Sequence, residues 1–100
     1  MRVIARSSLR AFAGKHPETD ASLAHWEAVV RAAAWKTIAE VNASFSKAKA
    51  LNAERVRFEV AGGDYRLIAA FDFARQAVFI KFIGTHAEYD RVDALTITQF

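Results

Sequence analysis

The hydrophobic pattern of this chain changes its period near Arg55, and that change limits the folds the chain can adopt. Before Arg55, apolar residues recur every three or four positions, which is the spacing of one helix face. From Arg55 to Val60, polar and apolar residues alternate, which is the pattern of a strand with one buried face. We therefore expect a helical first half and a sheet in the second half, which together make an α+β fold.

The first half predicts one short strand and three helices. Residues 1–5 form a β-branched run, and the first helix begins at Ser7 or Ser8 and is ended by Pro17. Apolar residues at helical spacing mark the three helices (Leu9, Phe12 and Ala13; Leu23, Trp26, Val30 and Ala33; Ile38, Val41 and Phe45). Residues 46–52 predict a polar connection to the sheet.

The second half predicts an antiparallel meander of three strands, at residues 55–60, 65–73 and 77–83. Gly62 and Gly63 supply the first turn, since glycine accepts the positive φ of tight hairpins. The tail at residues 94–100 is compatible with strand, helix or irregular chain. With 100 residues and 53% apolar composition, we expect one domain that spans residues 1–100.

Composition narrows the classes of function. The chain contains no cysteine, which removes disulfides, thiolate catalysis and thiolate zinc sites, and which suits the cytoplasm. The first residues lack the apolar stretch of a signal peptide, and no window is long enough to span a membrane. We therefore expect a cytoplasmic protein without a membrane partner. The net charge of +3 mildly favours an anionic partner.

Strand alternation gathers cations on one face of the predicted sheet. On the first strand, Arg55 and Arg57 lie opposite the apolar residues that face the helices. On the second strand Arg66 shares that outer face. On the third strand we expect Val78, Ile80 and Phe82 to face the helices, with Lys81 on the outer face between Phe79 and Ile83. The four cations would then converge on an uncovered face, with His86 and Tyr89 just beyond its end.

Such a set of groups suits metal-independent cleavage of RNA. That reaction needs a base for the 2′-hydroxyl proton, cations for the charge on the phosphoryl oxygens, and an acid for the departing 5′-oxygen. Arg66 is the expected phosphate clamp, because a guanidinium donates two parallel hydrogen bonds. The imidazole of His86 suits proton transfer at neutral pH, as base or as acid. Solvated outer-face cations, or an ion pair with Glu59, would explain part of the same pattern without any function.

More specific motifs for metal or phosphate binding are absent. His86 and Glu88 match the H-x-E half of zinc deaminases, but the cysteine half does not exist in this chain. A hairpin turn explains Gly62 and Gly63 without a phosphate-cradling loop. Asp90 and Asp93 are expected as caps or surface residues. We therefore expect no metal and no cofactor.

Two runs of sequence, Asp64-Tyr-Arg-Leu-Ile68 and Val78-Phe-Ile-Lys-Phe-Ile-Gly-Thr-His-Ala-Glu-Tyr-Asp90, resemble the HigB family of type II toxins. Shorter matches extend the resemblance over nearly the whole chain (Arg2-Val-Ile4, Leu9 with Phe12, His16-Pro17, Trp35-Lys36 and Arg55-Val-x-Phe58). The resemblance implies a RelE-like fold, in which N-terminal helices pack against one face of an antiparallel sheet and the other face carries the active site.

The resemblance also implies a function: an endoribonuclease that cuts messenger RNA, usually at the ribosome, and so inhibits translation. It implies neutralisation by a HigA-type helix-turn-helix antitoxin, and contact with operator DNA only through that complex. By position, Arg66, Lys81, His86 and Tyr89 are the expected catalytic residues. RNA binding is expected of three further cations (Lys36, Arg55 and Arg57).

Two alternatives remain open at this point. Relatives on this fold inhibit DNA gyrase by binding, without cutting RNA, because fold does not fix function. A catalytically silent toxin that binds RNA or the ribosome would use the same cations but not His86. The grouping of Lys81, His86 and Tyr89 favours the nuclease.

Overall fold

A computed structural model describes residues 1–100 as a five-stranded sheet with helices on one face. The strands are β1 (Arg2–Ile4), β2 (Lys49–Ala50), β3 (Arg55–Val60), β4 (Tyr65–Asp72) and β5 (Ala77–Thr85). The helices are α1 (Arg6–Lys15), α2 (Asp20–Ala32), α3 (Ile38–Ser44) and α4 (His86–Tyr89), with 3-10 turns η1 (Pro17–Thr19) and η2 (Ala61–Gly63). The α+β fold class predicted from the sequence is confirmed.

The sheet contains the predicted meander and two additions at its edges. Its strand order is β1-β5-β4-β3-β2, and the β3-β4 and β4-β5 pairs are antiparallel. β1 adds to β5 in the parallel direction, so the complete sheet is mixed. β2 lies within the segment predicted as a polar connection and pairs with the outer edge of β3. The antiparallel centre of the sheet therefore carries the four strand cations predicted for the site from the sequence, Arg55, Arg57, Arg66 and Lys81.

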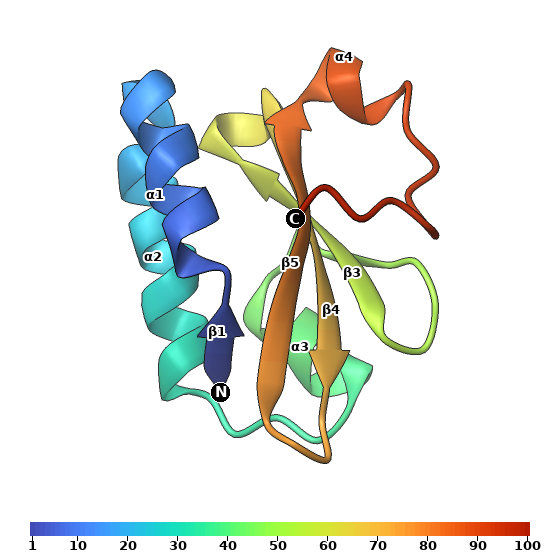
Figure 1. The fold of residues 1–100 in the computed structure, drawn as a ribbon. Helices are drawn as coiled ribbons and strands as arrows, with labels where there is room; N and C mark the ends of the chain where they lie inside the picture. The colour runs from blue at the N-terminus through green and yellow to red at the C-terminus, as the bar shows by residue number, and fades with distance from the viewer.

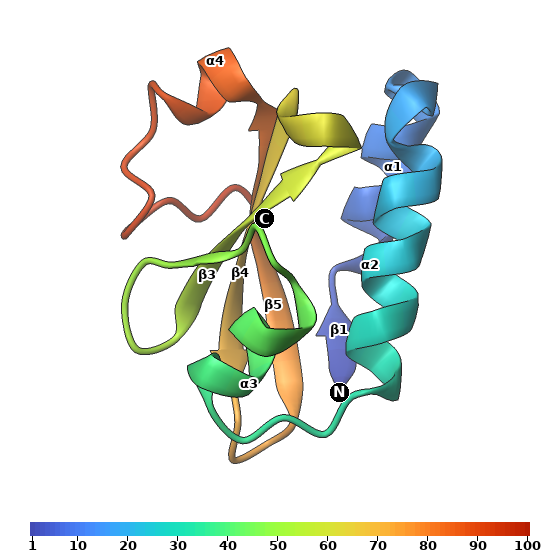
Figure 2. The same cartoon turned by 180° about the vertical axis from the view of Figure 1, so that it is seen from behind.

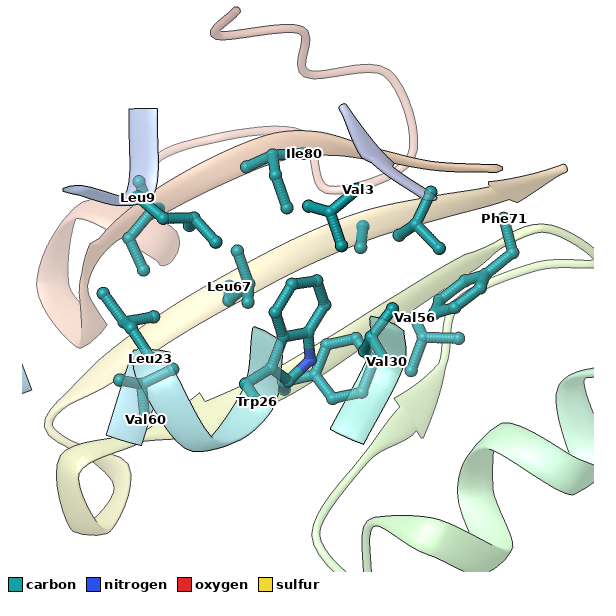
Figure 3. Close-up of a cluster of buried hydrophobic side chains, with 14 of the residues drawn as sticks. Val3, Leu9, Leu23, Trp26, Val30, Val56, Val60, Leu67, Phe71 and Ile80 are labelled. Atoms are coloured by element: carbon teal, nitrogen blue, oxygen red, sulfur yellow. The ribbon is translucent and has the colours of Figure 1, made fainter. Parts of the chain in front are cut away.

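The hydrophobic core fills the space between the helices and the inner face of the sheet. Figure 3 shows Trp26 and Val30 of α2 packed against Leu67 and Phe71 of β4. The ring of Trp26 meets Phe58 of β3 edge-on, with 5.4 Å between ring centroids. Because the helices bury this face, the polar members of each alternating strand are directed to the opposite face, which we call the open face.

A β-bulge in β5 changes which side chains reach the open face. Ile68 pairs with Phe82 and the next residue of β4 pairs with Ile80, so Lys81 is an extra residue without a partner. The bulge reverses the alternation that follows it: Phe82 lies on the open face and Ile83 joins the core. The predicted inward position of Phe82 and outward position of Ile83 are therefore wrong. Lys81 itself keeps its predicted face.

The end of the chain crosses the open face as an irregular segment, residues 91–100, which we call the strap (Figure 1). It runs from α4 to β3, where the Arg55 Nη1 donates to the carbonyls of Ala94 (3.1 Å) and Ile97 (2.8 Å). It then reaches the outer edge of β5, where the Gln99 amide donates to the Lys81 carbonyl at 2.9 Å. The expectation of an uncovered face is therefore wrong over the middle of the sheet.

Candidate functional site

Arg66 lies on the open face of β4, in register with Glu59 of β3 and Gly84 of β5. The residue is only 8% exposed. Its Nη1 donates to the Gly63 carbonyl, and to the Tyr65 carbonyl at 3.3 Å, which fixes the guanidinium against the η2 turn. No hydrogen bond engages its Nε or Nη2. These two donors form the fork that can bind a phosphate oxygen pair.

Gly84, the β5 partner of Arg66, leaves room for the ring of Phe82. A Cβ at this position would lie 2.7 Å from the Phe82 ring, so only glycine allows that ring to occupy the open face. The Phe82 ring in turn supports Tyr89, with 6.3 Å between the ring centroids. Tyr89 is thereby positioned at the same end of the open face as Arg66.

Helix α4 begins with a capping box. The Thr85 hydroxyl accepts from the Glu88 amide at 3.1 Å, and the Glu88 carboxylate accepts from the Thr85 amide at 2.8 Å. The hydrogen bond from the Thr85 backbone amide, followed by the contribution of the Thr85 side chain, lowers the pKa of the Glu88 carboxyl below its usual value. The box fixes the turn from β5 into α4, and with it the first helical residue, His86.

His86 is oriented by Asp90, one turn further along. Its Nδ1 lies 3.1 Å from the Asp90 Oδ2, and the side chain is 54% exposed. A carboxylate can only accept a hydrogen bond, so Nδ1 is the donor and the Nε2 of a neutral ring is left with a free lone pair. The sequence predicted Asp90 only as a cap or surface residue. Its spacing of four from His86 was the signal for this pair.

Lys81 lies on the open face but on the other side of the strap. Its Nζ is 5.6 Å from the centre of the Phe79 ring, which directs it toward the β4-β5 turn and away from Arg66. A hollow of about 360 Å³ lies beside this pair. Lys36 is exposed at the same end of the molecule and shares a second hollow with Phe73. The strap therefore divides the predicted cations into two groups.

The other two predicted RNA-binding arginines have protein partners. Arg55 is 9% exposed and holds the strap, as described above. The Arg57 Nη2 lies 3.4 Å from a carboxylate oxygen of Glu59 and 3.4 Å from the Lys47 carbonyl. Each guanidinium is thus engaged by the protein through one terminal nitrogen, Nη1 of Arg55 and Nη2 of Arg57. The pairing of Glu59 with an arginine was one of the interpretations the sequence left open.

A second cluster of polar side chains joins the helices to the end of β4. The Tyr65 hydroxyl donates to the Glu18 carboxylate and lies 3.4 Å from His16 Nδ1. The hydrogen bond from Tyr65 lowers the pKa of Glu18, and the same bond raises the pKa of Tyr65. His16 also stacks on Phe12 with 4.3 Å between ring centroids, so it packs as part of this cluster.

Of the predicted catalytic residues, Arg66 and Tyr89 therefore lie at one end of the open face, and His86 begins α4 just beyond that end, where its backbone amide donates to the Asp64 carbonyl at 2.9 Å. Lys81 shares the face but points to the far side of the strap. The part played by the strap was not predicted, because residues 94–100 show no clear period. No group of three or more His, Cys, Asp or Glu side chains is arranged to hold a metal ion. None of the helices combines the length and apolar content needed to cross a bilayer.

Comparison with known families gives a match over most of the chain. The family model of the HigB toxin, described as the RelE-like toxic component of a toxin-antitoxin system, matches residues 19–92. The match runs from η1 through α4 and includes every residue predicted for the site, but it stops before most of the strap. No curated protein matches the chain.

Proposed function

Since the chain belongs to the HigB family of RelE-like toxins, the toxic components of toxin-antitoxin systems, we propose that it is a metal-independent endoribonuclease that cleaves messenger RNA. One observation carries the proposal. Arg66 with two free donors and the phenol of Tyr89 lie at the same end of the open face, and His86, with its Nδ1 fixed on Asp90, begins helix α4 at that end of the sheet. These are the groups that phosphate-ester cleavage requires.

In the proposed reaction the RNA's own 2′-hydroxyl is the nucleophile. The 2′-oxygen forms a bond to the adjacent phosphorus while the bond from phosphorus to the 5′-oxygen breaks. The products are a 2′,3′-cyclic phosphate and a free 5′-hydroxyl. His86 Nε2 accepts the 2′-hydroxyl proton, and the Tyr89 phenol donates a proton to the departing oxygen. The free Nε and Nη2 of Arg66 stabilise the charge on the non-bridging oxygens.

Lys81 has a different part in this scheme from the catalytic one that the sequence predicted. Its ammonium lies over Phe79, across the strap from Arg66. We therefore assign it, with Lys36, to binding a phosphate elsewhere along the RNA. A lysine acts at such a position as a point charge rather than as a geometric clamp.

Family membership implies an antitoxin partner. We propose that this partner is a HigA-type helix-turn-helix protein, that the complex reaches operator DNA through the antitoxin, and that the toxin cuts its transcript on the ribosome in the cytoplasm. The resemblance of the sequence to HigB toxins supports these details.

His86→Gln tests the proposal, with His25→Gln on the exposed side of α2 as the matched control. Loss of a general acid or base lowers a rate by about 100- to 10,000-fold. We expect His86→Gln to lose most RNA cleavage and growth arrest, while His25→Gln retains both. If His86→Gln still arrests growth while messenger RNA stays intact, the toxin acts by binding, as a gyrase or ribosome inhibitor would.

A further inference from the structure

The hollow on the Lys81 side of the strap has no role in the cleavage scheme. It lies between the start of β3, the end of β4 and the middle of β5, and has a volume of about 360 Å³. Its walls come from seven residues (Glu54, Ala70, Phe71, Asp72, Phe73, Phe79 and Lys81). Small-molecule sites begin at about 300 Å³, so the hollow has room for a flat heteroaromatic ring.

The register of the sheet gives this hollow a flat floor. Ala70 of β4 lies opposite Phe79 of β5 on one side and opposite Arg55 of β3 on the other. The small side chain of Ala70 leaves the ring of Phe79 accessible from the side of β4. Arg55 itself is held by the strap and does not line the hollow. A planar group that enters here meets an aromatic surface.

Charged groups of opposite sign stand on the two sides of this surface. The Lys81 Nζ lies 5.6 Å from the centre of the Phe79 ring. On the other side Glu54 is exposed, and no hydrogen bond or ion pair engages its carboxylate. Asp72 differs from Glu54, because Asp72 accepts from the Arg75 amide at 3.1 Å. Glu54 is therefore the free acceptor at this site.

We propose that this hollow binds one unstacked base of single-stranded RNA, stacked on Phe79 with Lys81 at the adjoining phosphate and Glu54 at the edge of the base. Proteins recognise single-stranded RNA by stacking its bases on aromatic side chains and by hydrogen bonds to their edges. A carboxylate accepts from exocyclic amino groups such as cytosine N4, so the site favours adenine, cytosine or guanine over uracil. This inference rests on the proposed function and assigns part of its substrate recognition.

The test measures binding of short single-stranded 2′-O-methyl RNA to the complete protein by fluorescence anisotropy. This RNA lacks the attacking hydroxyl, so binding is separated from cleavage. One set of oligomers carries a base at every position, and the other has an abasic position moved along the strand. Phe79→Leu keeps an apolar side chain but removes the stacking surface. Phe100→Leu, at the end of the strap and 47% exposed, is the matched control.

We expect Phe79→Leu to weaken binding of the intact oligomer by about 5- to 150-fold, the range for one stacked base. For one abasic position, wild type and Phe79→Leu should bind equally. Glu54→Gln should reduce the preference over uracil. Equal losses for Phe79→Leu and Phe100→Leu, or a Phe79→Leu defect that persists with every abasic oligomer, would overturn the inference. So would a Phe79→Leu defect confined to antitoxin binding. Loss of cleavage in His86→Gln is a separate result and tests only the proposed function.

Discussion

The substitution Arg55→Met removes the main attachment of the strap while keeping a long apolar stem in place. In the structure the Arg55 Nη1 donates to the carbonyls of Ala94 at 3.1 Å and Ile97 at 2.8 Å. A hydrogen bond from a charged donor contributes about 1.5–3 kcal/mol. The freed carbonyls can turn to water because the strap is at the surface, so the loss should lie below the sum of the two bonds. We expect the free energy of strap opening to fall by about 2–3 kcal/mol.

Two backbone amides report strap opening directly. The Gln99 amide donates to the Lys81 carbonyl at 2.9 Å, and the Ile83 amide donates to the Gln99 Oε1 at 2.8 Å. Hydrogen exchange of both should accelerate by about 30- to 150-fold in Arg55→Met, since 1.36 kcal/mol is a factor of ten. Amides of the β3-β4 ladder should keep their wild-type rates.

Arg57→Met is the matched control for this experiment. Arg57 lies two residues along the same strand and binds Glu59 and the Lys47 carbonyl, not the strap. If both variants fold and exchange at Gln99 is unchanged in Arg55→Met, or equally faster in the two, Arg55 does not hold the strap.

The remaining predictions concern the capping box and the second polar cluster. Thr85→Ala removes the cap of α4 and should lower the free energy of unfolding, measured by urea denaturation, by about 0.5–2 kcal/mol. It should also slow RNA cleavage, because α4 carries His86. Thr85→Ser keeps a hydroxyl at the cap and should restore both stability and cleavage. The pKa of Glu18 is lower in the folded protein than in the unfolded chain. Its contribution to stability is therefore fully present above the pKa of the unfolded chain, and it is lost as the pH falls through the pKa of the folded protein. Tyr65→Phe removes the hydrogen bond that is the main cause of this lowered pKa. The stability of the Tyr65→Phe variant should therefore fall less steeply than that of the wild type during acidification. If the free energy of unfolding falls with pH at the same slope in the two proteins, this account is wrong.

Strand alternation was enough to predict which face of the sheet carries Arg66 and Lys81, because the side-chain period of a strand is two and the helices must cover the apolar face. Alternation alone puts Arg66 and Lys81 on one face of the sheet, and both residues lie there. It failed at Phe82 and Ile83, because a single bulge shifts the period and nothing in an apolar run shows where the extra residue lies. The role of Arg55 also escaped prediction. Its partners are backbone carbonyls of the strap, which carry no sequence signal.

The strap lies between the two places where RNA is proposed to bind, the Arg66 end and the hollow at Phe79. The strap (residues 91–100) carries one cation, Arg91, and one acidic side chain, Asp93, so it has no net side-chain charge that would attract a phosphate backbone. An RNA strand that reaches both places is therefore expected to lift the strap, and lifting it opposes binding. Because Arg55→Met weakens the strap, it should lower the Kd for 2′-O-methyl RNA, by no more than the increase in Gln99 exchange. Weaker RNA binding in Arg55→Met than in Arg57→Met would show instead that RNA needs the strap in place.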